Sequence, residues 1–256
     1  MLKVDGISRS YGELTVVDKL SFTVNEGEFV ALLGPSGCGK STSLKMIAGL
    51  EVPEAGSIEL DGRDITRLSP GERKLAMVFQ SYALFPHLKV EENILFGLQA
   101  RKVPKAEQKR RLDSVVEMVG LGDHLQKKPS QLSGGQCQRV ALARAIVAQA
   151  KLCLMDEPLS NLDAKLRNEM RTEIRALQQR LGMSVIYVTH DQVEAMSMAD
   201  RIVLMNNGKV EQIDVPEALY SKPKTIFTAQ FIGSPPMNII GSGADCRGIR
   251  PEHIEI

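Results

Sequence analysis

The sequence predicts an α/β fold with a parallel-sheet core and an inserted block of helices. The apolar run Glu28–Leu33 leads into a glycine-rich loop, and the helical pattern Ser41–Leu50 follows it. Two further apolar runs, Leu152–Asp156 and Ser184–Thr189, suit strands that are covered on both faces. The stretch between about 86 and 150 has a helical texture instead. Strand, glycine loop and helix in this order are typical of the opening of a parallel sheet.

Composition sets the broad class of protein. The chain has 256 residues, which suits one large domain with or without a small appendage. Hydrophobic residues make up 43% and charged residues 25%, an ordinary globular balance. Lys and Arg total 32 against 31 acidic residues, so the formal net charge is +1. Because a duplex-binding protein needs a surplus of cations, we expect no nucleic-acid partner.

The sequence shows neither a secretory signal pattern nor a pattern of cysteines that binds a metal. The N-terminal stretch Met1–Val17 lacks the apolar core of a secretory signal. The longest apolar runs are too short to cross a bilayer, so we expect a soluble intracellular protein with a peripheral membrane role. The four cysteines include no CxxC pair, which fits reduced thiols: Cys38, Cys137, Cys153 and Cys246.

The N-terminal part reads as strands joined by turns. Leu2–Val4 and Val16–Val24 are rich in β-forming residues, and Asn25–Gly27 is a turn signal. Ser57–Asp61 and Leu75–Gln80 are further strand candidates.

Helices are predicted in the middle of the chain. Pro104 suits the first turn of a helix, and apolar residues follow at helical spacing: Leu112, Val115, Val116 and Val119. The stretch Ala164–Leu181 is an amphipathic helix with one apolar stripe: Leu166, Met170, Ile174, Leu177 and Leu181. We expect the block at about 86–150 to be a helical subdomain inserted in a domain spanning residues 1–232.

The segment Gly34–Ser41 matches the phosphate-loop pattern G-x-x-x-x-G-K-[ST]. Glycines let backbone N–H groups point together at phosphate oxygens, and the following helix adds its positive N-terminal end. Lys40 is expected at the β- and γ-phosphates, and the Ser41 hydroxyl at Mg²⁺. The candidate nucleotide-binding residues are Gly34, Pro35, Ser36, Gly37, Cys38, Gly39, Lys40, Ser41 and Thr42. This pattern alone indicates a nucleoside triphosphate.

A second glycine-rich helix start occurs at Leu132–Gln136. It makes another anion-binding surface, to which Ser133 adds a hydroxyl. One nucleotide does not need two such helix starts, so the second is predicted to serve the nucleotide of a partner copy. The residues are Ser133, Gly134, Gly135 and Gln136. A flexible helix C-cap is the alternative interpretation.

Acidic and polar side chains follow the predicted strands. Asp156 ends an apolar strand and is expected near Mg²⁺, and Glu157 is placed to polarise the attacking water. His190 follows the strand Ser184–Thr189 and is a candidate for the γ-phosphate. The amide of Gln80 is a candidate ligand of Mg²⁺ or of the water. The alternative for the two acids is that they only begin a solvated loop, and the alternative for His190 is a structural role.

Taken in order, these motifs resemble the ABC-transporter ATPase family from about Leu2 to Asn238. The resemblance implies a P-loop NTPase cassette: a RecA-like core, an N-terminal antiparallel β subdomain and the inserted helices. It implies ATP and Mg²⁺ as cofactors, and a homodimer, or a pair with a similar ATPase, that sandwiches two ATP molecules head to tail. Glu157 is then the general base and His190 the γ-phosphate partner.

Two more residues gain roles from the resemblance. Tyr11 would stack on adenine, with a core or strand aromatic as the alternative. Asp163 in Ser160–Asp163 would lie across the dimer seam near the opposing catalytic site.

At a finer level, Ser81–His87, Asp156–Arg167 and Phe231–Asn238 look like bacterial importers of the sugar and glycerol-phosphate type. Polyamine and iron importers have similar residues in these segments. The likeness implies two integral-membrane permease subunits, an external solute-binding protein, and a peripheral place at the cytoplasmic face of the cell inner membrane. The apolar segment Tyr82–Pro86 is expected to receive a coupling helix of the permease, and core packing is the alternative.

The C-terminal stretch 233–256 departs from that importer pattern. Gly248–His253 resembles a motif from inside the family's β-rich accessory domain, yet it follows Asn238 after only a few residues. We expect a linker plus a remnant of that domain, either shortened or folded onto the core.

Two other functions are weighed. A soluble nucleic-acid-linked ABC ATPase would carry coiled-coil insertions, zinc modules or two cassettes, and a non-hydrolysing structural module would not need Lys40, Asp156 and Glu157 together. Cys38 precedes a helix, a setting that lowers thiol pKa values, and we expect its alkylation to block ATP binding.

Overall fold

The computed structural model describes residues 1–241 and 246–254. It divides into two compact units: the first unit comprises Met1–Arg67 and Val188–Ile256, and the second unit comprises Leu68–Tyr187. The chain passes from the second unit to the first within strand β8 (Ser184–Thr189), whose six residues are all buried.

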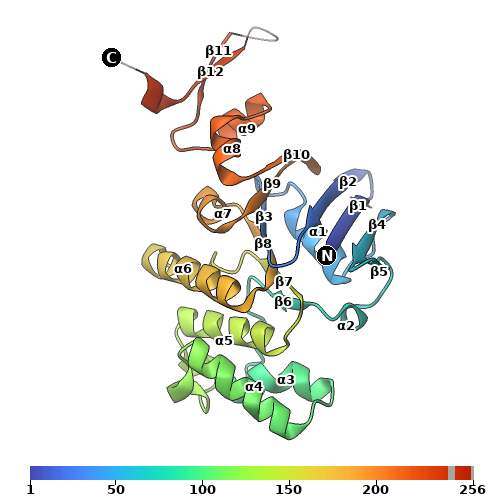
Figure 1. Ribbon diagram of the computed structural model, residues 1–256, viewed down its shortest axis with the longest axis vertical. Coiled ribbons are helices and arrows are strands. Elements are labelled where there is room, and N and C mark those ends of the chain that lie inside the picture. The colour runs from blue at the N-terminus through green and yellow to red at the C-terminus, as the bar shows by residue number, and fades with distance from the viewer. Residues whose placement is uncertain (242–245, 255–256) are drawn as a thin grey trace. The chain divides into compact units, whose positions relative to one another are not determined.

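An antiparallel sheet opens the first unit (Figure 1). Its strand order is β2-β1-β4-β5, with β1 at Leu2–Tyr11, β2 at Leu14–Val24, β4 at Ala55–Leu60 and β5 at Arg63–Asp64. This confirms the predicted N-terminal antiparallel strands. Strand β1 continues well beyond the expected Leu2–Val4, because register shifts carry its pairing with β2 as far as Tyr11. Such bulges break the alternation on which the prediction relied.

A second set of strands in the first unit carries the phosphate-loop segment. Strand β3 (Phe29–Leu33) is buried at every residue and pairs in parallel with β9 (Arg201–Asn206). Strand β10 (Lys209–Asp214) adds to β9 in antiparallel fashion. Helices α1 (Lys40–Ala48) and α7 (Gln192–Met198) belong to the same unit. A fully apolar strand of this kind fits the predicted parallel core.

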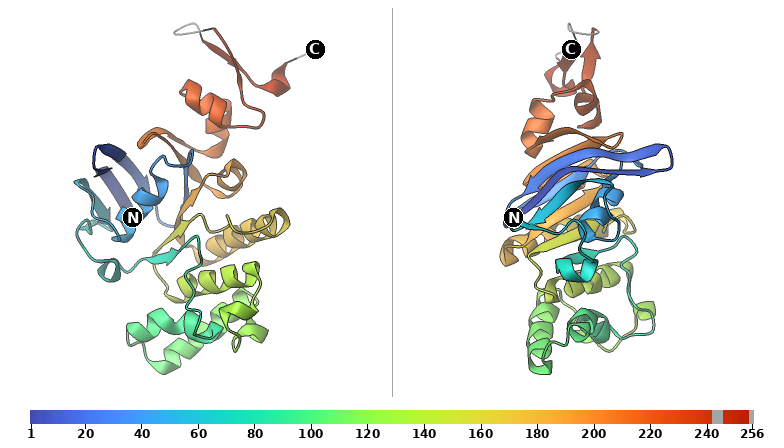
Figure 2. Two further views of the ribbon diagram at one scale, coloured as in Figure 1. Left: turned by 180° about the vertical axis from the view of Figure 1, so that it is seen from behind. Right: turned by 90° about the vertical axis from the view of Figure 1, so that its right-hand side faces the viewer.

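The C-terminal part of the first unit holds short elements (Figure 2). They are α8 (Pro216–Ser221), α9 (Ile226–Phe231), β11 (Asn238–Ile240), β12 (Arg247–Ile249) and η4 (Pro251–His253). The two strands pair antiparallel, a feature that the weak periodicity of the stretch did not predict.

One arginine ties this C-terminal segment to the helices before it. Arg250 is 3% exposed and donates hydrogen bonds to the carbonyls of Tyr220, Ala229 and Ile232. Its guanidinium also lies 4.1 Å from the centre of the Tyr220 ring. The predicted tail therefore packs on α8 and α9 as far as it is described; residues 242–245 and 255–256 lie outside the described residues. A domain boundary at residue 232 stays a prediction.

The second unit combines strands and helices. Strand β6 (Ala76–Val78) runs parallel to β7 (Leu152–Asp156), and β8 lies on the other side of β7. Helix α2 (Pro70–Arg73) precedes β6. Strand β6 ends at Val78, earlier than predicted, so that Gln80 stands in the turn after the strand.

Helices fill the stretch where they were predicted. Helices α3 (Val90–Ala100), α4 (Lys105–Met118) and α5 (Gly134–Val147) pack against one another, with the 3-10 helices η1 (Gly122–His124) and η2 (Pro129–Gln131) between α4 and α5 in the chain (Figure 1). The apolar positions predicted to face inward are buried: Leu112, Val115, Val116 and Val119.

Helix α6 has the predicted bounds, Ala164–Leu181. Met170, Ile174 and Leu177 are buried, but Leu181 at the end of the stripe is exposed. Of the helices described, none is both long and apolar enough to cross a bilayer.

Candidate functional site

The predicted phosphate loop stands between β3 and α1 in the first unit. Helix α1 begins at Lys40 with Gly39 as its N-cap residue, and no side chain caps this end. The uncapped N–H groups of a helix start are donors for an anion. Lys40 is 4% exposed, and its ammonium donates to the carbonyls of Gly34 at 2.8 Å and Pro35 at 2.7 Å. The loop's own carbonyls thus hold the ammonium at the start of the helix.

Two glycines of this loop have no room for a side chain. A Cβ on Gly34 would lie 2.2 Å from the carbonyl oxygen of Met205, and one on Gly39 would lie 2.4 Å from that of Val16. Gly39 also has a φ of 96°, in the left-handed region that favours glycine. The loop is therefore built on close backbone approaches within the first unit. Such a glycine-lined helix start fits a polyphosphate group.

Cys38 in this loop corrects one expectation. The residue is 5% exposed, and burial raises the pKa of its thiol, although the Lys40 ammonium opposes the shift. The expected lowering by the helix N-terminus is wrong, because loss of solvation outweighs it. The Cys38 sulfur lies 3.8 Å from the Lys40 nitrogen, so a group added there would crowd the ammonium.

Tyr11 ends β1 and is 47% exposed, which excludes a core aromatic but leaves the strand aromatic that was the other form of the alternative. Its hydroxyl donates to the Glu51 carboxylate, and this bond raises the pKa of the phenol. The Arg9 guanidinium lies 5.1 Å from the centre of the ring. An exposed ring fixed from both sides suits stacking of a planar base. That role for Tyr11 remains a prediction.

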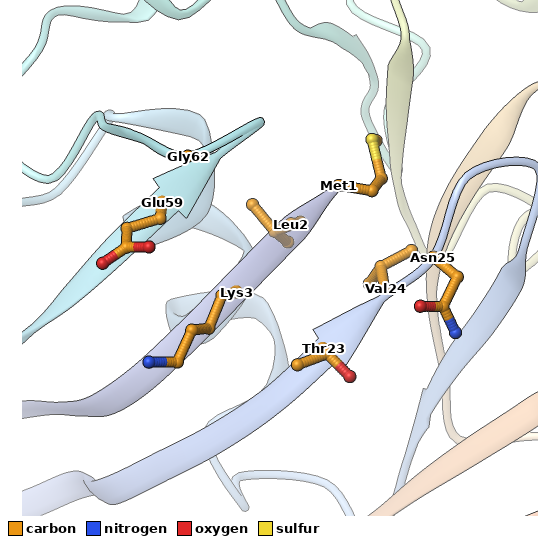
Figure 3. A pocket seen from close by; sticks show the side chains of 8 residues that line it. All are labelled: Met1, Leu2, Lys3, Thr23, Val24, Asn25, Glu59 and Gly62. Carbon is orange, nitrogen blue, oxygen red and sulfur yellow. The ribbon is translucent and has the colours of Figure 1, made fainter.

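His190 follows β8 in the first unit and is exposed. It lines a hollow of about 580 Å³ with one face of α7 and the chain near Tyr220 and Ile232. A second hollow of the unit, about 280 Å³, lies at one end of the antiparallel sheet (Figure 3). None of the predicted site residues is among those that line it: Met1, Leu2, Lys3, Thr23, Val24, Asn25, Glu59 and Gly62.

The second unit brings Gln80 next to the segment after β7. The amide nitrogen of Gln80 donates to the Ser160 hydroxyl at 3.3 Å, and the Asn161 amide donates to the Gln80 carbonyl at 2.9 Å. The Ser160 hydroxyl in turn donates to the Glu157 carbonyl at 2.9 Å. Glu157 has a φ of 42°, so its backbone is held in the left-handed region. The structure therefore links two of the predicted catalytic residues through Ser160.

Asp156 stands at the last position of β7 and is half-buried. Asp163 is the N-cap residue of α6, where its carboxylate accepts a hydrogen bond from the Leu166 N–H at 3.0 Å. This capping role is a contact that the sequence interpretation did not foresee for Asp163.

The second glycine-rich helix start is confirmed as the N-terminus of α5. The Ser133 hydroxyl accepts from the Gln136 N–H at 3.3 Å, and the Gln136 side chain accepts from the Ser133 N–H at 2.9 Å. These two bonds form a capping box. A helix so capped has a fixed start, and the flexible cap that was the alternative does not describe it.

The two glycines of this helix start differ in their surroundings. A Cβ on Gly135 would lie 2.8 Å from the end of the Leu166 side chain, which would have to shift to make room for it. Gly134 is exposed, and the nearest atom to a Cβ there would be 3.4 Å away. Nothing inside the second unit explains why Gly134 has no side chain. The predicted contact of Gly134 with a partner's nucleotide stays a prediction.

The side chains expected at Mg²⁺ are Ser41 in the first unit and Gln80 and Asp156 in the second. A hydroxyl, an amide and a carboxylate supply the oxygen ligands that Mg²⁺ prefers. The set therefore fits this ion by its chemistry.

Two polar residues of the second unit were missed from the sequence, the buried Asn93 and the half-buried Arg144. Asn93 on α3 and Arg144 on α5 both bond to the backbone of the stretch 80–89, which we term the 80–89 loop. An asparagine among the apolar positions of a helix is only a weak sequence signal for such a contact. A single arginine in a helix gives no signal for it.

The chain is similar to known proteins in both sequence and fold. The sequence profile of the family described as "ABC transporter" matches residues 17–160. A Bacillus thuringiensis (strain Al Hakam) protein named spermidine/putrescine import ATP-binding protein PotA is 50% identical over 256 residues, which are 100% of this chain and 78% of that protein. A Rhizobium etli protein named sn-glycerol-3-phosphate import ATP-binding protein UgpC 1 is 52% identical over 234 residues, 91% of this chain and 67% of that protein.

A solved structure is also similar. It is titled "Dimeric Structure of MJ0796, a Bacterial ABC Transporter Cassette", and it matches with a TM-score of 0.75 and 32% sequence identity. The match covers 84% of this chain and 99% of that one.

Proposed function

The chain belongs to the ABC transporter family as one of its ATP-hydrolysing subunits, and from this premise we propose that two copies bind two ATP molecules between them and energise solute import. The observation that carries the proposal is the presence of two glycine-lined helix starts in one chain. The start of α1 carries Lys40, whereas the start of α5 presents Ser133 and an exposed Gly134. A head-to-tail pair uses both, since the α1 start of one copy and the α5 start of the other face one triphosphate.

Roles follow from the chemistry of each side chain. Lys40 and the N–H groups around Gly39 bind the phosphates, and Tyr11 stacks on the adenine. Glu157 accepts a proton from the attacking water, and His190 bonds to the γ-phosphate. Asp163 stands near the opposing site across the seam. Mg²⁺, held by Ser41, Gln80 and Asp156, supplies charge neutralisation at the phosphates when it is bound.

Ser160 gives Glu157 and Gln80 a shared support. It donates to the Glu157 carbonyl and accepts from the Gln80 amide. The position of the catalytic carboxylate is thereby linked to the 80–89 loop. Because a proton acceptor must stand within hydrogen-bond reach of the water, such a link ties turnover to the state of that loop.

The 80–89 loop is the part of the chain that we assign to the permease. Phe85 packs against Phe96 of α3 with ring centres 4.3 Å apart, yet Phe96 remains 44% exposed. Ala83, Pro86 and His87 are exposed as well. The loop is thus partly packed and partly open, and its open apolar face suits a coupling helix of one of two integral-membrane permease subunits. We therefore propose that the chain works at the cytoplasmic face of the cell inner membrane, with an external solute-binding protein in the same system.

The cargo is proposed as a sugar or a glycerol phosphate, with a polyamine, iron or another small solute as the alternative. The relatives named for sn-glycerol-3-phosphate and for spermidine and putrescine are 52% and 50% identical to the chain. So small a difference does not separate the two, because the cargo does not touch this subunit.

Purification of the tagged chain from its native membrane tests the import role. We expect two permease subunits and a solute-binding protein to co-purify, and the complex to hydrolyse ATP faster when the binding protein carries its solute. A screen of glycerol phosphates, sugars, polyamines and iron chelates on that binding protein then identifies the cargo. Recovery of the chain with nucleic acid and without membrane subunits would contradict the proposal.

A further inference from the structure

The 80–89 loop is held by side chains from three different elements of the second unit. Asn161, after β7, donates to the Gln80 carbonyl at 2.9 Å. Asn93 of α3, which is fully buried, accepts from the Phe85 N–H at 2.8 Å and donates to the carbonyls of Phe85, Leu88 and Lys89. The remaining support comes from α5.

That support is Arg144. Its two terminal nitrogens donate to the carbonyls of Ala83 and Tyr82, each at 2.7 Å. Both bonds go to main-chain atoms of adjacent residues, which a planar guanidinium is shaped to reach together. Arg144 is half-buried, and partial burial lowers the pKa of its guanidinium; the bond to Tyr82 is partly buried and the bond to Ala83 is exposed.

The two residues that Arg144 holds are themselves unusual. Tyr82 has a φ of 63° and Ala83 a φ of 46°, both in the left-handed region that side chains other than glycine avoid. Consecutive residues keep such a conformation only when their surroundings fix it. Arg144 supplies that fixation, because its fork binds both carbonyls at once.

Arg144 also connects this loop to the start of α5. It lies in the last turn of the helix, and Ser133 caps the first turn. Ser133 and Arg144 are eleven residues apart, which at 1.5 Å per residue is about 16 Å along one continuous helix. A displacement of Tyr82 and Ala83 is therefore passed by the helix to Ser133 and Gly134.

We propose that Arg144 is a positioning residue that couples the 80–89 loop to the nucleotide-facing tip of α5. This inference rests on the proposed function, in which the loop receives the permease and the tip covers a partner's ATP. Movement of the loop by the permease then moves the tip, and closure of the tip on ATP moves the loop. Thermodynamic linkage requires the coupling to run equally in both directions.

Three variants test the coupling. Arg144→Met removes both hydrogen bonds and keeps most of the side-chain length. Arg144→Lys keeps the charge but cannot bind both carbonyls through a planar fork. Arg180→Met is the matched control, because Arg180 is an exposed arginine of α6 in the same unit.

The first measurement is amide hydrogen exchange on the isolated chain with and without Mg²⁺-ATP. In the parent chain we expect ATP to slow exchange both at 133–136 and at 80–89. In Arg144→Met we expect slowing at 133–136 alone, in Arg144→Lys a partial response at 80–89, and in Arg180→Met the parent pattern. A parent-like response at 80–89 in Arg144→Met would overturn the inference.

The second measurement is ATP hydrolysis by the complex with the co-purified permease. We expect Arg144→Met to lower the stimulation by the permease about tenfold, the size of a typical coupling. If Arg144→Met does not fold, Arg144→Lys carries the test through its partial loss in both measurements. Full stimulation in a variant whose loop exchanges faster would show that Arg144 only stabilises the loop. Absence of permease binding by the parent chain would instead remove the proposed function.

Discussion

At the scale of single residues, the proposed hydrolysis of ATP depends most on Glu157. Its carboxylate follows directly on β7, and its backbone is fixed in the left-handed region and bonded to Ser160. Substitution by glutamine keeps the shape and removes the proton acceptor. In the proposed mechanism this substitution therefore separates binding of ATP from its hydrolysis.

We predict that Glu157→Gln keeps ATP binding and lowers turnover by roughly 10²–10⁴. Equilibrium binding of a labelled ATP and phosphate release by the transport complex measure the two effects. Asn168→Gln on the exposed face of α6 serves as the control and should leave both unchanged. Near-normal phosphate release by Glu157→Gln would remove the residue from the role of general base.

Cys38 gives a prediction about pH. Because burial raises the pKa of its thiol, less of it is thiolate at neutral pH than in a free thiol. We expect its alkylation by iodoacetamide to be slower than that of glutathione at pH 7 and to keep accelerating at a pH where the glutathione rate has levelled off. Mass spectrometry of the labelled peptide measures the rates.

The alkylated protein should also lose ATP binding, because the Cys38 sulfur lies 3.8 Å from the Lys40 nitrogen. Stoichiometric labelling at Cys38 with unchanged ATP affinity would disprove this crowding. If Cys38 is alkylated at pH 7 as fast as glutathione, burial does not raise the pKa of its thiol.

The site residues were predictable to the extent that a short motif carries them. The loop Gly34–Ser41 and the helix start Ser133–Gln136 were located because their chemistry needs glycines at fixed positions. Asn93 and Arg144 were not, since they bond to backbone atoms 8 and 61 residues away, and no motif in the sequence encodes such contacts. The raised pKa of Cys38 likewise depends on burial that spacing does not show.

At the scale of elements, the loop held by α3 and α5 is the feature with the clearest energetic consequence. Asn93 is fully buried and makes four hydrogen bonds to the chain between Phe85 and Lys89. Removal of its side chain leaves buried backbone groups without those partners. Unmet buried groups are costlier than the net gain from a typical hydrogen bond.

We predict that Asn93→Ala lowers the free energy of unfolding by about 2–4 kcal/mol. Urea unfolding followed by circular dichroism measures the change. Asn168→Ala is the control: Asn168 is exposed and its side chain accepts one bond from Arg171, so the expected loss is below about 1 kcal/mol. Equal losses in the two variants would contradict the importance of the Asn93 network.

Element boundaries followed the sequence where periodicity was strong. Helix α6 begins and ends where its amphipathic pattern does, and β3 and β8 match their apolar runs within one residue. Strand β1 exceeded its predicted length because bulges interrupt its alternation. Strands β11 and β12 were missed because each has three mostly exposed residues and leaves no apolar pattern.

At the scale of the whole molecule, we propose that one chain contributes to two different sites. In this proposal the glycine loop before α1 binds one triphosphate, and the N-terminus of α5 covers the triphosphate bound by another copy. The exposed Gly134, whose missing side chain nothing in the second unit explains, is the local sign of that arrangement. The similar solved structure is titled as a dimer.

Crosslinking between two marked copies tests this claim most directly. One copy carries Ser36→Cys, and the other carries Ser133→Cys and a size tag; both serines are exposed. Both copies also carry Glu157→Gln, so that bound ATP is not hydrolysed. Chains with only the native cysteines report the background. The account predicts that a short bifunctional thiol reagent joins the two different copies when Mg²⁺-ATP is present, and that neither copy joins to itself. Monomers alone, or joining that does not depend on ATP, would contradict it.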